Sequence, residues 1–304
     1  MERSEIREGG PAFRFAPCGL HLSIARLLRY ETCMNRPGLM IALAIGAVTG
    51  VAFGWFPQLD LKLSGLFFDP ETRQFTLLHQ VRFEHLSWPA HLRDWSMWLV
   101  AALAVPAGAA LAAKCFFPTT RMRVGGRAIV FLLATIALGP GVLVNAVLKE
   151  HWDRPRPIAV REFNGPEHFV AWWDPRGACR HNCSFVAGEA SGAFWTLAPA
   201  ALAPAPVRIF AYAAAITFGG AVGMLRMAFG AHFFTDVVFA GVFTFLIVWI
   251  VHGALYRWRR TAISDAAIER AIERVFLPPH AAFVRFLARW FGRARRAGPH
   301  PGGT

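Results

Sequence analysis

Six long apolar runs alternate with polar connections along the chain. A membrane-spanning helix needs about 20 mostly apolar residues. Six segments reach or approach that length: Leu39–Phe56, Trp95–Ala113, Ala128–Leu148, Phe185–Leu202, Val207–Leu225 and Val237–Leu255. Six buried helices of a soluble protein are the alternative, but runs such as Val237–Val251 lack the polar face that a soluble helix keeps. The pattern therefore predicts an all-α fold, a bundle of six transmembrane helices.

Arginine and lysine gather in the connections on one side of this bundle. Cytoplasmic loops of membrane proteins carry an excess of these residues. They precede the first span, separate the second from the third and follow the sixth: Arg26, Arg29, Arg36, Lys114, Arg121, Arg123, Arg127, Arg257, Arg259 and Arg260. This places both termini in the cytoplasm. The connections Pro57–Asp94, Lys149–Ser184 and Arg226–Asp236 then face outward.

Composition supports a membrane protein. Of 304 residues, 55% are hydrophobic and 17% are charged, against roughly 25% charged in soluble domains. The net charge of +13 fits either nucleic acid or a membrane. Because the basic residues lie between apolar runs and not along one solvated face, we expect no nucleic-acid partner. We divide the chain into a cytoplasmic segment 1–36, a membrane domain 37–256 and a basic cytoplasmic tail 257–304.

The tail has its own pattern. Ser264–Arg296 predicts one or two amphipathic helices, interrupted at Pro278–Pro279. A basic amphipathic helix suits the anionic inner leaflet. Packing of this helix against the bundle is an equal alternative.

The third outward connection carries a candidate nucleophile. His232 and Asp236 lie four residues apart, on one helix face. An aspartate that accepts a hydrogen bond from one imidazole nitrogen leaves the other nitrogen free to attack. Ionisable residues at membrane depth are functional candidates. A structural pair that caps the helix is the alternative.

The second outward connection predicts an anion site. Lys149 and Arg156 are separated by six residues, and Pro157 stiffens the segment. An arginine fork with a lysine point charge suits phosphate, although a basic loop near lipid headgroups fits too. The connection ends in small residues around Gly188, where a helix start offers backbone N–H groups to an anion.

Together these segments resemble the type 2 phosphatidic acid phosphatase family. Its first motif is Lys, six residues, Arg-Pro, and its third is Ser-Arg, five residues, His, three residues, Asp. The first motif is complete here, and the third has Leu225 in place of serine: Lys149, Arg156, Pro157, Arg226, His232 and Asp236. The resemblance covers roughly Asp60 to Val251.

The middle motif departs from the family. Where the family has Pro-Ser-Gly-His, this chain has Val186-Ala187-Gly188-Glu189. The serine that contacts phosphate and the histidine that protonates the leaving group are both replaced. The Gly-Glu variant, with Asp60–Ser64, Trp172–Trp173 and Asn182–Phe185, resembles a bacterial subgroup that includes lipid A 1-phosphatases.

The resemblance implies a metal-independent mechanism without a cofactor. The phosphate is cradled by Lys149, Arg156, Arg226 and the amide of Gly188, as the family motifs imply. His232 attacks phosphorus to form a phosphohistidine, and Asp236 orients it. Glu189 is the candidate general acid; His181 is another, and simple pairing of Glu189 with an arginine is a third possibility.

Several substrates fit this resemblance. A lipid of the periplasmic leaflet of a bacterial inner membrane is expected, with lipid A 1-phosphate ahead of lipid A 4′-phosphate, isoprenyl pyrophosphate, phosphatidylglycerophosphate and phosphatidic acid. A lipid phosphotransferase and a non-catalytic lipid-binding or transport protein are the alternatives. No protein partner is implied. Outside the cytoplasm, Cys179 and Cys183 are a candidate disulfide, although the ring would be small.

Overall fold

The computed structural model describes residues 34–85, 87–122, 124–261 and 263–296. Most of them are helical, and a short strand pair joins Phe68 to Phe75. The predicted segment 1–36 lies largely outside the described residues. In chain order the elements are α2 (Arg36–Trp55), α3 (Gln58–Gly65), β1 (Phe68–Asp69), β2 (Gln74–Phe75), α4 (Thr76–Arg82), α5 (Trp88–Phe116), α6 (Gly126–Ile136), the π-helix η1 (Ala137–Leu148), α7 (Lys149–His151), the 3₁₀ helices η2 (Pro157–Ala159) and η3 (Arg161–Phe163), α8 (Gly188–Phe194), α9 (Leu197–Ala201), α10 (Ala205–Ala228), α11 (Phe234–His252), the π-helix η4 (Gly253–Arg257) and α12 (Asp265–Arg296).

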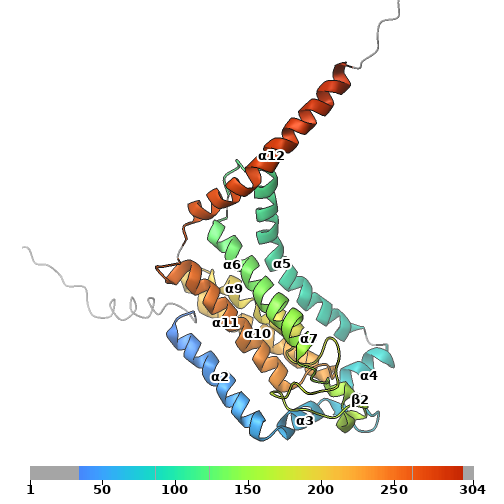
Figure 1. Ribbon diagram of the computed structural model, residues 1–304. Helices are drawn as coiled ribbons and strands as arrows, with labels where there is room; N and C mark the ends of the chain where they lie inside the picture. Colours follow the sequence, from blue (N-terminus) through green and yellow to red (C-terminus); the bar gives the residue numbers. More distant parts are fainter. Residues whose placement is uncertain (1–33, 86, 123, 262, 297–304) are drawn as a thin grey trace, which may run out of the picture.

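Five helical stretches of the described chain are long and apolar enough to cross a membrane. They are Arg36–Trp55, Trp88–Phe116, Gly126–His151, Ala205–Ala228 and Phe234–Arg257. Their outer faces expose large apolar side chains, such as Val48 and Phe210, which suit lipid and not water. The chain is therefore a membrane protein. The long helices lie side by side, and α3, α4 and β2 gather at one end of the bundle (Figure 1).

The segment predicted as the fourth span, Phe185–Leu202, differs from the expectation. It forms two short helices, α8 and α9, separated by a turn at Trp195–Thr196. α8 packs against α5, η1, α10 and α11, and its small residues are buried. Small residues allow helices to approach closely, so this segment fills the centre of the bundle. The six-span count is not confirmed within the described residues.

The tail helix α12 also differs, since it continues through Pro278 and Pro279. Proline removes a backbone donor, but its fixed φ of about −65° is compatible with a helix. The first half of α12 docks on the bundle: the buried ammonium of Lys114 binds Glu269 at 3.0 Å and Glu273 at 2.7 Å. The second half projects beyond the bundle, at the end opposite α3 (Figure 1).

A tight turn joins α10 to α11 and places the candidate nucleophile. Gly230 has a φ of +66°, which side chains with a Cβ rarely adopt, and a Cβ here would meet the ring of Phe75. The carbonyl of Gly230 accepts a hydrogen bond from Ile158 N at 3.0 Å. The turn before His232 is thus tied to the segment that follows Arg156.

Candidate active site

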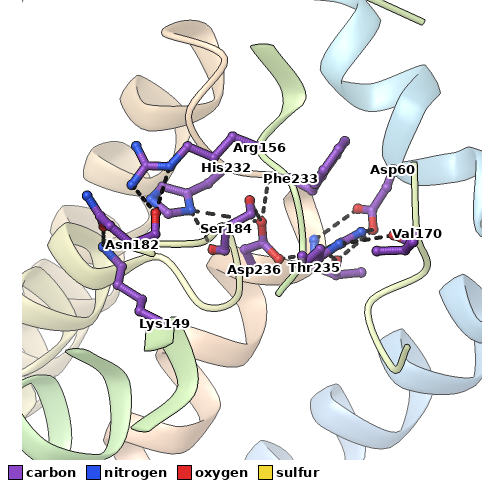
Figure 2. Close-up of polar contacts among 11 residues, drawn as sticks. Asp60, Lys149, Arg156, Val170, Asn182, Ser184, His232, Phe233, Thr235 and Asp236 are labelled. Atoms are coloured by element: carbon purple, nitrogen blue, oxygen red, sulfur yellow. Dashed lines mark hydrogen bonds and ion pairs between the residues drawn. The ribbon is translucent and has the colours of Figure 1, made fainter. Parts of the chain in front are cut away.

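His232 is buried in a cationic environment. The residue is 1% exposed, and Lys149, Arg226 and Arg156 all act on it electrostatically. Lys149 and Arg226 come from the ends of two helical stretches, and Arg156 comes from the loop after α7. Figure 2 shows Arg156, Asn182 and Lys149 on one side of His232, with Ser184 and Asp236 on the other. The structure therefore brings together the residues that the sequence places in separate connections.

The backbone of Ser184 orients the imidazole. His232 Nδ1 donates to the carbonyl oxygen of Ser184 at 2.7 Å, because a carbonyl can only accept. The proton is thereby fixed on Nδ1, and Nε2 keeps its lone pair. The direct hydrogen bond expected between His232 and Asp236 is not formed, since Asp236 Oδ2 lies 3.9 Å from Nδ1.

Asp236 instead holds the surrounding backbone. Its Oδ2 accepts from Ser184 Oγ and from Phe233 N, the latter at 2.8 Å. Its backbone carbonyl accepts from Ala187 N at 3.1 Å. Asp236 therefore holds three backbone segments together. They are Ser184, which bonds His232, Phe233, the N-cap of α11, and Ala187, which precedes α8. The carboxylate also caps α11, as the structural alternative predicted.

A buried arginine links Asp236 to a residue far away in the sequence. Arg154 Nη1 donates to Asp236, and Nη2 donates to Asp60 at 2.8 Å. Asp60 also accepts from Thr235 N at 3.0 Å. Burial disfavours the charged form of Arg154, but the two carboxylates outweigh it and hold its pKa above the ordinary value. This network of two anions and one cation anchors α3 to the first turn of α11.

The phosphate-binding candidates Lys149 and Arg156 share one loop residue. Lys149 Nζ donates to Asn182 Oδ1 at 3.1 Å, and Arg156 Nη2 donates to the carbonyl of Asn182 at 2.7 Å. Cys179 and Cys183 form a disulfide around Asn182. The Cys183 amide also bonds the Lys149 carbonyl at 3.0 Å. The loop is therefore tied to both cations.

Gly188 lies against the lysine. A Cβ at this position would be 2.7 Å from Asn145 Oδ1 and 3.0 Å from Lys149 Nζ. Neither neighbour can retreat freely, because Asn145 bonds the carbonyl of Pro140 at 2.7 Å and Lys149 bonds Asn182. The glycine therefore permits the close approach of α8 to Lys149.

Glu189 is held by two arginines. Arg93, on α5, binds its carboxylate through Nε at 3.0 Å and Nη2 at 2.8 Å. Arg226 Nε lies 3.3 Å from the other oxygen, Oε2. The geometry supports the third sequence-based possibility, arginine pairing. His181 is 86% exposed and pairs with Glu150, on the outer surface of the loop.

Comparison with known proteins agrees with this arrangement. The PAP2 superfamily model matches residues 128–260. A lipid A 4′-phosphatase of Francisella tularensis subsp. novicida (strain U112) is 33% identical over 225 residues, which cover 74% of this chain and 98% of that protein. The chain belongs to the PAP2 superfamily. Membership confirms the predicted family and enzyme class, a phosphatase that hydrolyses phosphoric monoesters.

Two further relatives of this PAP2 protein align with a smaller part of its chain. A lipid A 4′-phosphatase of Rhizobium leguminosarum is 42% identical over 106 residues, 35% of this chain and 46% of that protein. One of Rhizobium etli (strain ATCC 51251 / DSM 11541 / JCM 21823 / NBRC 15573 / CFN 42) is 39% identical over 105 residues, 34% of this chain and 41% of that protein. No solved structure matches the chain.

The electrostatics of this PAP2 site favour a neutral imidazole. Burial lowers the pKa of His232 well below 6.5, and Lys149, Arg226 and Arg156 lower it further, against the hydrogen bond to Ser184. A neutral imidazole with a free Nε2 is the nucleophilic form. Within the described residues, His, Cys, Asp and Glu form no group of three or more that could hold a metal ion.

Sequence reasoning left out four residues of the site. Asp60 and Arg93 lie before the residues 128–260 that match the PAP2 model, and no spacing connects them to His232. Asp60, Arg154 and Asn182 stand inside quoted segments, but their partners are far away in the sequence. For Asp60 the available signal was the resemblance of Asp60–Ser64 to the bacterial subgroup.

Proposed function

We propose that this PAP2 phosphatase removes a phosphate from lipid A, at the 4′ position, through a phosphohistidine on His232. The observation that carries the catalytic part is the buried imidazole whose Nδ1 bonds the Ser184 carbonyl, with three cations around it. The names of the three relatives support lipid A and the 4′ position. They favour the 4′ position over the 1-position that the sequence analysis put first.

The proposed reaction is an in-line attack. Nε2 of His232 forms the N–P bond as the bond from phosphorus to the sugar oxygen breaks, and that oxygen takes up a proton from solvent water. Water then cleaves the N–P bond and releases inorganic phosphate. Lys149, Arg156, Arg226 and the amide of Gly188 would neutralise the equatorial oxygens, which is most of the catalysis in phosphoryl transfer.

The leaving group depends on the phosphate position. An anomeric hydroxyl, as released from the 1-position, is more acidic than an ordinary alcohol and needs less protonation. The secondary hydroxyl released from the 4′ position depends more on cations or on a proton donor. The need for a proton donor therefore differs between the two phosphate positions of lipid A.

The orientation follows from charge and from the loop disulfide. Basic residues flank the bundle at the end where α12 docks, opposite the site (Figure 1). Cytoplasmic flanks carry this bias, and the Cys179–Cys183 disulfide suits an oxidising compartment. We place the site at the periplasmic face of a bacterial inner membrane, with residues 1–36 and 257–304 in the cytoplasm.

This orientation is tested by labelling. A membrane-impermeant maleimide should label a cysteine placed at Glu162 in intact spheroplasts, but should label one at Arg260 only after lysis. The reverse pattern would overturn the proposed topology.

The function is tested by phosphate release in detergent. Lipid A, phosphatidic acid, phosphatidylglycerophosphate and undecaprenyl pyrophosphate are compared for the wild type, His232→Ala and His168→Ala, with chelator. His168 is an exposed histidine of the same outward segment, so it is the matched control. We expect release from lipid A that only His232→Ala abolishes. Mass spectrometry of the product identifies the position.

Other outcomes separate the alternatives. Transfer of phosphate to a second lipid without inorganic phosphate would indicate a phosphotransferase. No turnover of any lipid, or turnover in His232→Ala equal to wild type, would overturn the catalytic proposal in favour of lipid binding.

A further inference from the structure

We infer that Glu189 and Arg93 form a clamp that positions Arg226 at the phosphate site, and that Glu189 is not the proton donor. This inference rests on the proposed function and assigns Arg93 a role in it. The second family motif has a histidine where this chain has Glu189, so the residue cannot simply inherit the histidine's role.

Both carboxylate oxygens of Glu189 already accept hydrogen bonds. Arg93 donates Nε and Nη2 to Oε1, at 3.0 and 2.8 Å, and Nε also reaches Oε2 at 3.1 Å. A guanidinium keeps its protons in proteins and only donates. If Glu189 carried a proton, that proton would compete with the N–H groups of Arg93 for the same carboxylate oxygens. Charge-assisted hydrogen bonds of this kind suit a carboxylate that accepts and not one that donates.

The clamp connects the surface to the buried cation. The side chains of Arg93, Glu189 and Arg226 are 45%, 21% and 12% exposed. Arg226 Nε is buried without a hydrogen-bond partner among the described residues, and Glu189 Oε2, 3.3 Å away, supplies its ion pair. Since Arg226 acts on His232 electrostatically, a shift of its guanidinium would change the phosphate site.

The position of Arg93 agrees with this role. Arg93 lies in the first turns of α5, outside the matched residues of the PAP2 model, and α5 packs against α8, which carries Glu189. The pair of Arg93 and Glu189 therefore links α5, which lies outside residues 128–260, to the middle motif, where this chain departs from the family. A glutamate at this position depends on an arginine from α5.

The test compares Arg93→Gln, Glu189→Gln, the double variant Arg93→Gln/Glu189→Gln and the charge reversal Arg93→Glu/Glu189→Arg. Release of phosphate from lipid A is measured as kcat and KM from pH 5 to 9, with thermal unfolding as a check on folding. Arg176→Gln is the matched control, because Arg176 forms an exposed two-point pair with Asp174.

A clamp predicts that both single variants lose about 10²-fold in kcat/KM at every pH, as a displaced catalytic group would. The double variant should lose no more than either single variant, because the two residues act as one unit. The charge reversal should not recover the loss, because it removes the carboxylate that pairs with Arg226 and places a second guanidinium beside it. Arg176→Gln should match wild type.

A proton donor predicts the opposite for Arg93. The guanidinium engages both oxygens of Glu189 and would hinder a proton transfer from it, so Arg93→Gln would gain activity. That result, or unequal and additive losses, would overturn the inference while leaving the proposed function intact.

Binding of orthovanadate gives a second measurement that does not need turnover. It should raise the unfolding temperature of wild type and Arg176→Gln, and raise it much less in Arg93→Gln and Glu189→Gln. Equal shifts in all four proteins would overturn the clamp. Absence of lipid turnover with normal vanadate shifts in wild type would count against the proposed function alone.

Discussion

His232 Nδ1 lies 2.7 Å from the carbonyl oxygen of Ser184 and 3.9 Å from Asp236 Oδ2. The imidazole is therefore oriented by backbone, and Asp236 acts one step further away, through the hydroxyl of Ser184. The spacing of His232 and Asp236 on one helix face predicted a direct pair. α11 begins at Phe234, so His232 precedes the helix and does not share its face.

Ser184→Ala should preserve most of the activity. The substitution removes the hydroxyl that donates to Asp236 but keeps the carbonyl that accepts from His232. We expect a loss of about 1–3 kcal/mol of stability from the weakened buried carboxylate, and less than a tenfold loss in kcat. Thermal unfolding and phosphate release measure the two effects. A loss as large as that of His232→Ala would show that the hydroxyl itself orients the nucleophile.

The pH dependence should lack an acid limb from His232 near 6.5. Burial and three cations depress the pKa of His232, so the neutral form persists as the pH falls through 6.5. Below about pH 6.5 the unfolded state binds a proton on His232 that the folded state does not bind. The free energy of unfolding therefore declines as the pH falls from about 6.5 to the folded-state pKa. Nitrogen NMR of labelled histidine, with His232→Ala to assign the signal, measures the titration. A midpoint at or above 6.5 would contradict the burial argument.

Asp60→Asn should destabilise the fold. Asp60 and Arg154 are 1% and 0% exposed, and removal of one partner from a buried ion pair costs about 3–5 kcal/mol. The loss is measured by thermal unfolding in detergent. Asp69→Asn, in the same outward connection but bonded only locally to Thr72 and Glu71, is the control and should change stability much less.

Gly188→Ala should disrupt the phosphate site. The new Cβ would lie 3.0 Å from Lys149 Nζ and 2.7 Å from Asn145 Oδ1, so the lysine must move. We expect a loss of about 10²-fold in kcat/KM. Gly220→Ala is the matched control, because nothing lies within 4 Å of a Cβ there. Equal activity of both variants would show that the ammonium of Lys149 is free to adjust.

Lys114→Met should release the tail without silencing the enzyme. The ammonium of Lys114 joins Glu269 and Glu273 of α12 to α5, far from His232. We expect faster tryptic cleavage at Arg270 and Arg274, with kcat for lipid A within about twofold of wild type because no site residue is touched. Unchanged cleavage would mean that apolar contacts alone hold α12.

The sequence alone determined the class of protein and the identity of most candidate groups. Apolar runs long enough to span a bilayer require helices, and two motifs with fixed spacing contain Lys149, Arg156, Arg226 and His232. Apolar runs and motif spacings depend only on residues that are close together in the sequence, so they can be recognised without the fold. The buried centre of α8, the continuous α12 and the partner of His232 depend on what packs around them.

Only the tertiary structure decided how the groups are held. Asp60 and Arg93 reach the site from α3 and α5. Asp60 is buried, and a buried charge needs an opposite charge wherever the fold brings one. Glu189 faces two arginines, Arg93 from α5 and Arg226 from α10. Sequence placed a carboxylate where its relatives by motif have a histidine; the packing of α5 against α8 gave that carboxylate its partner.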